Sequence, residues 1–236
     1  MKLIGIAAAL CALALSAQFA SAQGYRIEGG VGGTFGQNDA KAGIASGGSL
    51  VTIEDNDIGG SGLAAGGAIW ADGPLAALSP ALRNISLGLE YRHFENSTTT
   101  TVSVVTPSGS GSGAISGDFT SDNLLFDVAW RLNDGVVHPF VGAGGGVAFV
   151  DLNGTVSASS GAISVGTPTS FSAGASSTVA AGHAFIGLDY DITPQVYVGA
   201  VGDFYFTDTV SKQFSHTNFQ LSSQQISLLG HLGWKF

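Results

Sequence analysis

The sequence predicts an all-β fold: an eight-stranded antiparallel up-and-down transmembrane β-barrel that follows a cleaved signal peptide. Three observations predict this class. First, 44% of the 236 residues are hydrophobic and only 11% are charged, yet no apolar stretch after residue 22 reaches the length of a membrane-spanning helix. Second, eight later segments alternate apolar and polar residues, as half-buried strands do. Third, the connections between these segments are alternately short and long, which is typical of barrels that cross an outer membrane.

The N-terminal segment has the three parts of a secretory signal peptide. Lys2 gives a positive start, residues 3–15 form an apolar run, and Ala-Ser-Ala at 20–22 forms a small-residue cleavage site. The apolar run is too short to cross a membrane as a helix of about 20 residues. We therefore expect a signal peptide over 1–22, export through the general secretory pathway, and one barrel domain over 23–236.

The composition excludes several other classes of protein. Glycine accounts for 36 residues, a much larger share than the roughly 7% of ordinary domains, which also carry about 25% charged residues. The hydrophobic content argues against disorder. The 17 acidic residues outnumber the 8 basic ones, so a nucleic-acid partner, which needs clustered Lys and Arg, is not expected. The single cysteine lies in the predicted signal peptide, and the barrel is expected to contain no disulfide.

The eight alternating segments are the predicted strands. They span 24–36, 62–72, 83–95, 119–132, 136–150, 178–191, 195–207 and 222–236. The short connections, predicted as periplasmic turns, are 73–82, 133–135 and 192–194. The long connections, predicted as four extracellular loops, are 37–61, 96–118, 151–177 and 208–221. Because the long connections are rich in Gly, Ser and Thr, we expect them to form mobile loops or hairpin extensions above the membrane.

Alternation within the segments separates lipid-facing from lumen-facing side chains. In the last segment the lipid-facing set is Ile226, Leu228, Gly230, Leu232, Trp234 and Phe236. The segments 24–36, 83–95 and 119–132 repeat this pattern, whereas 62–72 is too rich in glycine and alanine for its faces to be assigned. The glycine run at 142–146 is interpreted as close strand packing at a bend in the wall.

Aromatic residues are predicted to form a girdle at each end of the apolar band, where their rings sit at head-group depth. The periplasmic girdle is predicted to contain Tyr25, Trp70, Trp130, Tyr190, Tyr197 and Trp234. The outer girdle is predicted to contain Phe35, Tyr91, Phe149, Phe204 and Phe206. All three tryptophans of the sequence therefore fall at the periplasmic end.

Charged residues at the lumen-facing positions are the main candidate site. They are Arg26, Glu28, Glu90, Arg92, Asp127, Arg131, His183, Asp189, Asp203, His231 and Lys235. The interior of an eight-stranded barrel is just wide enough for side chains to fill it. Because an uncompensated buried charge costs several kcal/mol, we expect these groups to pair and to close the lumen. The alternative is a narrow or gated pore whose paired charges exchange partners.

Three stretches resemble a known family. They are His-Pro-Phe-Val-Gly-Ala-Gly-Gly-Gly at 138–146, Asp-Ile-Thr-Pro-Gln-Val-Tyr-Val-Gly at 191–199, and Gly-Trp-Lys-Phe at 233–236. Together they resemble the small outer-membrane β-barrel proteins that include opacity-type proteins and the transmembrane domain of OmpA. The resemblance implies a place in the outer membrane of a Gram-negative cell. It implies no catalytic residue and no cofactor.

The resemblance also assigns a role to the last strand. In this family the final aromatic residue of the barrel is read by the barrel-assembly machinery, which implies that role for Phe236 together with Trp234 and Leu232. Unlike full-length OmpA, the protein is expected to have no peptidoglycan-binding domain after the barrel. A role in tethering the membrane to the wall is therefore not expected.

Three classes of function remain open. The favoured one is a structural or surface-interaction barrel whose loops contact host, matrix or lipopolysaccharide. The second is a narrow OmpW-like channel for small solutes. The third is a lipid-modifying enzyme, for which His93, Glu95 and Ser97 are candidates, although neighbours two and four residues apart in a strand do not by themselves form a nucleophile, base and acid relay. The acidic run 54–57 lacks the ligand spacing of a calcium loop, so no metal site is expected.

Overall fold

The computed structural model describes most of the chain from residue 24 onward. The described backbone covers 24–46, 49–106, 109–133, 135–159, 171–214 and 217–236. Side chains are described within 24–36, 60–97, 118–133, 135–151, 153, 176–209 and 223–236. The predicted signal peptide, 1–22, lies outside the described residues.

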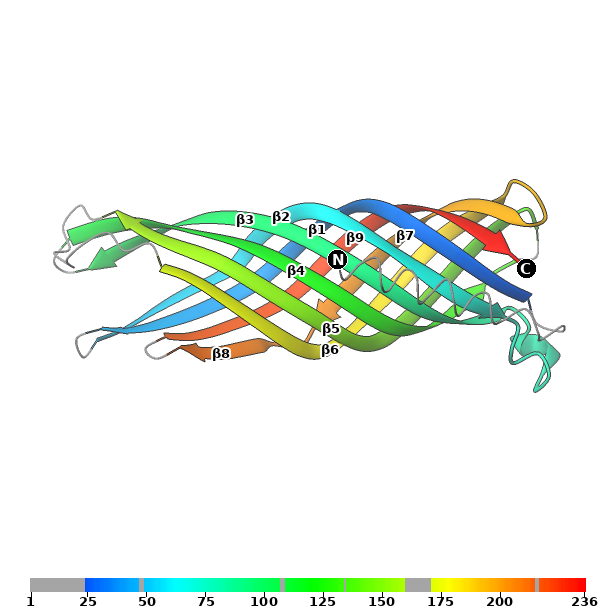
Figure 1. The fold of residues 1–236 in the computed structure, drawn as a ribbon, viewed down its shortest axis with the longest axis horizontal. Helices are drawn as coiled ribbons and strands as arrows, with labels where there is room; N and C mark the ends of the chain where they lie inside the picture. Colours follow the sequence, from blue (N-terminus) through cyan, green and yellow to red (C-terminus); the bar gives the residue numbers. More distant parts are fainter. Residues whose placement is uncertain (1–23, 47–48, 107–108, 134, 160–170, 215–216) are drawn as a thin grey trace.

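Within the described backbone, nine strands form one closed sheet (Figure 1). They are β1 (Gly24–Ser46), β2 (Ser49–Asp72), β3 (Ile85–Thr106), β4 (Gly109–Arg131), β5 (Val137–Ser159), β6 (Phe171–Asp191), β7 (Val196–Thr207), β8 (Val210–Phe214) and β9 (Thr217–Lys235). Neighbours pair antiparallel, and pairing of β1 with β9 closes the barrel. Because β7 and β8 pair with successive stretches of β9, they form one wall strand interrupted at 208–209. The wall therefore has the eight strands that the sequence predicts.

The connections at one end of the barrel are short, as predicted. Between β2 and β3 the chain forms turns and a short 3-10 helix, η2 (Pro80–Leu82), capped by the Ser79 hydroxyl, which accepts from the Ala81 amide. Between β6 and β7, the Thr193 hydroxyl accepts from the Val196 amide at 2.9 Å. We call this end of the barrel the turn end. In the described part of the chain, no helix is both long and apolar enough to cross a membrane.

At the opposite end, which we call the hairpin end, the strands continue through most of the predicted loops. The β1–β2 ladder reaches Ser46 opposite Ser49, and the β3–β4 ladder reaches Thr106 opposite Gly109. Of the two forms expected for the long connections, the structure shows hairpin extensions. The β3 extension contains a run of Thr and Val residues, whose branched side chains favour extended backbone.

The ladders stop at different heights, so the extended wall divides. Among the described residues, β2 and β3 pair only up to Ser61 and Ser97, and β6 and β7 only up to Ala181 and Thr207. Pairing continues beyond these points within β8–β9–β1–β2 and within β3–β4–β5–β6. Two four-stranded sheets therefore leave the barrel at the hairpin end, and they are seen as two arms in Figure 1.

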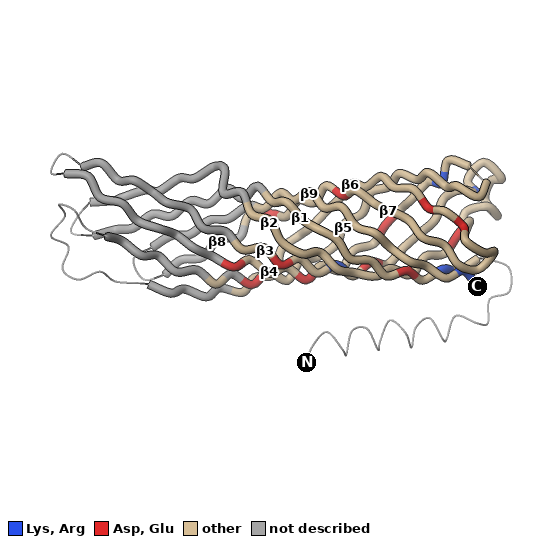
Figure 2. The backbone as a smooth tube through the Cα atoms, turned by 90° about the horizontal axis from the view of Figure 1, so that it is seen from above, with Lys and Arg blue, Asp and Glu red and all other residues tan. Residues whose placement is uncertain are grey.

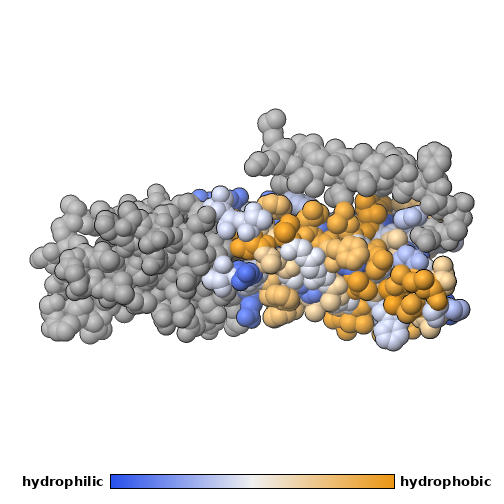
Figure 3. All heavy atoms as spheres, turned by 90° about the horizontal axis from the view of Figure 1, so that it is seen from below, coloured by the Kyte–Doolittle hydropathy of each residue, from blue (hydrophilic) through white to orange (hydrophobic). Residues whose placement is uncertain are grey.

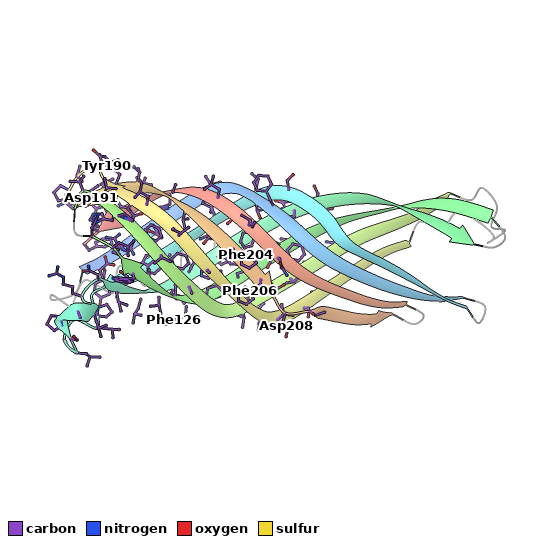
Figure 4. All side chains as sticks on the ribbon, turned by 180° about the vertical axis from the view of Figure 1, so that it is seen from behind. Phe126, Tyr190, Asp191, Phe204, Phe206 and Asp208 are labelled. Atoms are coloured by element: carbon purple, nitrogen blue, oxygen red, sulfur yellow. The ribbon has the colours of Figure 1, made fainter. Side chains whose placement is uncertain are left out.

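The outer surface of the barrel carries a continuous apolar band, as Figure 3 shows for one face. The lipid-facing set predicted for the last strand is confirmed, since Ile226, Leu228, Leu232, Trp234 and Phe236 are all exposed. Figure 4 shows Phe126, Phe204 and Phe206 on the outside of the barrel. Closure of the barrel pairs the backbone hydrogen-bonding groups of the wall, and the apolar band suits contact with lipid. Both features are those of a barrel that crosses a membrane.

Two members of the predicted periplasmic girdle do not lie on the outer surface, so the prediction was wrong for them. Trp130, Tyr190 and Trp234 are exposed at the turn end, but the Trp70 and Tyr197 side chains lie inside the lumen, with 3% and 0% of their surface exposed. A Cβ at Gly88 would lie 2.6 Å from the Trp70 ring, and one at Gly233 would lie 2.1 Å from the Tyr197 ring. Each ring thus occupies space that a neighbouring glycine leaves free inside the barrel.

A charge in the middle of the apolar band is expected to destabilise the barrel. Leu228→Arg places an arginine on the lipid side of β9, where it should cost about 2–4 kcal/mol. Gln224→Arg is the matched control, because it lies on the same face of β9 opposite Phe206, near the edge of the band, and should cost about 0–1 kcal/mol. Urea unfolding in lipid vesicles measures both, and equal losses would contradict the position of the band.

Candidate functional site in the barrel lumen

The charged residues inside the barrel gather into two buried clusters, and Figure 2 shows charged positions along the described part of the wall. The cluster nearer the turn end, here the basal cluster, contains Arg26, Glu28, Asp72, Arg131, Asp189 and His231. The second, here the central cluster, contains Glu90, Arg92, Asp127, His183 and Asp203. Together they include ten of the eleven predicted lumen residues and add Asp72.

Asp189 on β6 is the centre of the basal cluster, and its side chain is completely buried. Arg131 Nη2 donates to Oδ2 at 2.7 Å, His231 Nε2 lies 2.7 Å from Oδ1, and Arg26 Nη1 lies 3.6 Å from Oδ2. These partners come from β4, β9 and β1. A Cβ at Gly199 would lie 2.6 Å from Asp189 Oδ1, so the glycine gives this carboxylate its space. One carboxylate therefore joins four strands.

Arg26 extends the basal cluster toward the turn end. Its Nε donates to Asp72 Oδ1 at 3.0 Å, and its guanidinium lies 4.8 Å from the Trp70 ring. Glu28 accepts from both aromatic side chains that the sequence analysis placed outside: from Trp70 Nε1 at 2.9 Å and from the Tyr197 hydroxyl at 2.6 Å. Asp72 and Trp70 were missed as lumen residues because both lie in the segment whose faces could not be assigned.

The central cluster links four strands, and Ser227 on a fifth strand, β9, contacts it. Arg92 Nη2 on β3 lies 2.7 Å from Glu90 Oε1, and Arg92 Nη1 donates to Asp203 Oδ2 on β7 at 3.0 Å. His183 Nε2 on β6 lies 2.8 Å from Asp127 Oδ1 on β4, and the His183 Nδ1 atom lies 3.5 Å from Asp203 Oδ1. Ser227 on β9 donates to Asp203. The pairs thus cross the lumen and do not only join adjacent strands.

Aromatic side chains fill much of the remaining lumen, which the sequence analysis expected to be polar. Phe140, Phe185, Phe94 and Tyr205 are buried, and the rings of Phe94 and Tyr205 meet edge to face at 4.6 Å between centroids. The Tyr205 hydroxyl donates to Glu90 at 2.7 Å. A cavity of about 20 Å3 lies between the clusters, lined in part by Glu28, Glu90, Arg92 and His231. It has room for about one or two waters.

Lys235, the remaining predicted lumen residue, belongs to a separate group at the turn end. Its Nζ donates to Asp191 at 2.5 Å, and His138 Nε2 lies 3.0 Å from the same carboxylate. The Lys235 and Asp191 side chains are partly exposed, and Asp191 is labelled at this end of the barrel in Figure 4. The group lies at the rim and does not close the lumen.

The candidate enzyme residues lie on the outer surface near the hairpin end. His93 Nδ1 lies 2.8 Å from Asp122 Oδ1 on β4, and the Tyr91 hydroxyl donates to the same oxygen at 2.6 Å. Among the described side chains, no hydrogen bond joins His93 to Glu95 or Ser97. The acidic run 54–57 lies within β2, but its side chains are outside the described set.

The comparisons with known proteins support the fold. No protein-family model matches the sequence, and no curated protein matches it. Among solved structures, the outer membrane protease OmpT from Escherichia coli is similar over 92% of this chain and 99% of that chain, with a TM-score of 0.50 and 11% identity. Neisserial surface protein A matches 90% of this chain and 97% of its own at a TM-score of 0.42 and 13% identity.

OprG, an outer membrane protein of Pseudomonas aeruginosa, matches 91% of this chain and 96% of its own at a TM-score of 0.44 and 14% identity. At these identities the likeness concerns the fold alone. The closed wall, the apolar band and the likeness to OmpT define a membrane-spanning β-barrel of the outer-membrane type. This confirms the predicted fold class.

Removing the charge of Asp189 is expected to destabilise the barrel strongly. Asp189→Asn keeps the shape of the side chain but leaves Arg131 and His231 without a charged partner in a buried site, which should cost about 3–5 kcal/mol of unfolding free energy. Asp191→Asn is the control at the exposed rim and should cost ~1 kcal/mol or less. Urea unfolding in vesicles compares the two, and a small loss for both would mean that the basal cluster does not stabilise the fold.

Proposed function

We propose that this chain is a structural and surface-interaction barrel of the Gram-negative outer membrane, with a lumen that stays closed. The observation that carries the proposal is the filling of the lumen at two levels by the basal and central clusters. Asp189 in the basal cluster and Asp127 in the central cluster have no exposed surface. The role is proposed to be non-catalytic.

The energetics of the clusters argue against conduction. A permeating ion would have to separate groups such as Arg92 and Asp203, or Arg131 and Asp189, and leaving one such partner uncompensated costs about 3–5 kcal/mol. The cavity between the clusters has room for about one or two waters. Buried rings fill further lumen space beside the clusters, with Phe140 next to His231 and Phe185 next to His183.

The hairpin end supports the surface-interaction part of the proposal. The strands continue past the apolar band as two sheets, which gives the protein a large structured region outside the membrane. We infer that these extensions contact host, matrix or lipopolysaccharide, and that the band contacts outer-membrane lipid. Leu232, Trp234 and Phe236 are exposed on the last strand, where the barrel-assembly machinery could read them.

Conductance measurements test the closed lumen. In planar bilayers we expect no resolved conductance steps from the wild-type barrel. We also expect none from the double variant Glu90→Gln with Arg92→Gln, because the basal cluster still blocks the lumen. A shift in gel mobility on boiling verifies that each preparation is folded. Steps from the wild-type protein that the double variant alters would overturn the proposal in favour of a gated pore.

Shortening a hairpin tests whether the extensions serve function and not folding. Replacing residues 100–115 with Asn-Gly joins Thr99 to Ser116, which face each other in the β3–β4 ladder, through a turn suited to a two-residue hairpin. The barrel should keep its heat-modifiable fold, because both clusters and the apolar band lie in the remaining residues. Cells that display the shortened protein should adhere less to a matrix-coated surface. Loss of the fold would contradict this division of roles.

A further inference from the structure

We propose that the central cluster is a binding site for a divalent metal ion, with Glu90, Asp127 and His183 as its protein ligands. The three side chains come from β3, β4 and β6, all are buried, and one ligand atom of each lies within 4.8 Å of the other two. Ligands bound to one zinc ion at about 2.0–2.2 Å lie within roughly 4.4 Å of each other. Small rotations of the side chains therefore suffice to close the site.

The charges of the two clusters differ in a way that points to a missing cation. In the basal cluster, three carboxylates face Arg26 and Arg131, and protonation of His231 brings the sum to zero. In the central cluster, three carboxylates face Arg92 alone, so the cluster remains negative even when His183 is protonated. A divalent cation beside a neutral His183 brings that sum to zero, which removes a buried uncompensated charge.

Unpartnered atoms point to the same place. Asp127 is fully buried, and its Oδ1 contacts His183, but its Oδ2 has no hydrogen-bond partner. The His183 Nδ1 and Asp203 Oδ1 atoms lie 3.5 Å apart and are also buried without a hydrogen bond. Buried polar atoms of folded proteins nearly always have partners. Two unpartnered carboxylate oxygens in one negative cluster, Asp127 Oδ2 and Asp203 Oδ1, are acceptors that a cation would satisfy.

Gly144 keeps the site free of other side chains. In the wall, Gly144 on β5 pairs with Asp127 on one side and with His183 on the other. A Cβ at this position would lie 1.8 Å from Asp127 Oδ1 and 2.6 Å from His183 Nε2. Even a methyl group would therefore displace Asp127 Oδ1 and His183 Nε2.

The donor set indicates the class of ion. An imidazole nitrogen with two carboxylate oxygens suits zinc and similar divalent transition ions, with a water as the fourth ligand. The neighbouring cavity, which Glu90 lines, has space for such a water. A bound ion would join three strands of the wall and stabilise the folded barrel. This inference does not depend on whether the lumen conducts.

Direct zinc analysis tests the site. The protein is folded in detergent with zinc chloride present, or folded first and then exposed to zinc, because the closed lumen can limit entry. After a chelating resin removes free ion, mass spectrometry should find about one zinc per wild-type barrel in at least the first preparation. Zinc should also raise the unfolding temperature of that protein. Absence of zinc from both preparations overturns the proposal and means that protons alone balance the cluster.

Matched variants locate the ion. Asp127→Asn and His183→Gln should lower the zinc content at least tenfold. Gly144→Ala keeps every ligand but occupies the site, and should lower it similarly. His231→Gln and His93→Gln remove the histidines of two other His–Asp pairs and should leave the zinc content unchanged. Zinc that survives in all three central variants, or disappears with His93→Gln, overturns the assignment. The shift in gel mobility on boiling shows which variants are folded. If Asp127→Asn and His183→Gln do not fold, the zinc contents of Gly144→Ala and of the two control variants decide whether the assignment holds.

Discussion

Burial of charge inside a closed eight-stranded wall is the constraint on which the rest of this structure depends. The interior is narrow enough for side chains to fill it, so every charged group there must find a partner or destabilise the barrel. Asp189 joins β6 to β4, β9 and β1, and Arg92 joins Asp203 across the lumen. The same pairs that stabilise the wall also occupy the space through which a solute would pass. The proposed closure of the lumen therefore depends on the same pairs that stabilise the wall.

The unusual glycine content follows from the same constraint. Large or charged side chains inside a narrow barrel need space that a neighbouring Cβ would occupy, and glycine at the facing position provides it. Gly144 makes room for Asp127 and His183, Gly199 for Asp189 and His231, and Gly233 for Tyr197. The run at 142–146, interpreted from the sequence as close packing of strands, has two of its glycines beside Phe185 and the central cluster.

Alternation in the sequence predicted the fold class, the strand count and the lipid-facing side of four strands, because the face of a side chain depends only on a period of two. It failed for Trp70, whose glycine- and alanine-rich neighbours carry no alternation. Which charged residues pair inside the lumen could not be predicted, for another reason. Alternation gives the face of Arg92 but not its height relative to Asp203, which depends on the stagger of strands far apart in the sequence. Hairpin extensions were one of two expected forms, since Gly- and Ser-rich segments suit both.

The coupling between Arg92 and Asp203 tests the central claim, that charge pairing across the lumen stabilises the barrel. A double-mutant cycle with Arg92→Met and Asp203→Asn, followed by urea unfolding in vesicles, measures the interaction free energy of the pair. We expect the pair to be coupled by about 1.5–3 kcal/mol, within the range seen for residues in one buried network. A coupling near zero would mean that the pair does not stabilise the barrel, and would contradict the account.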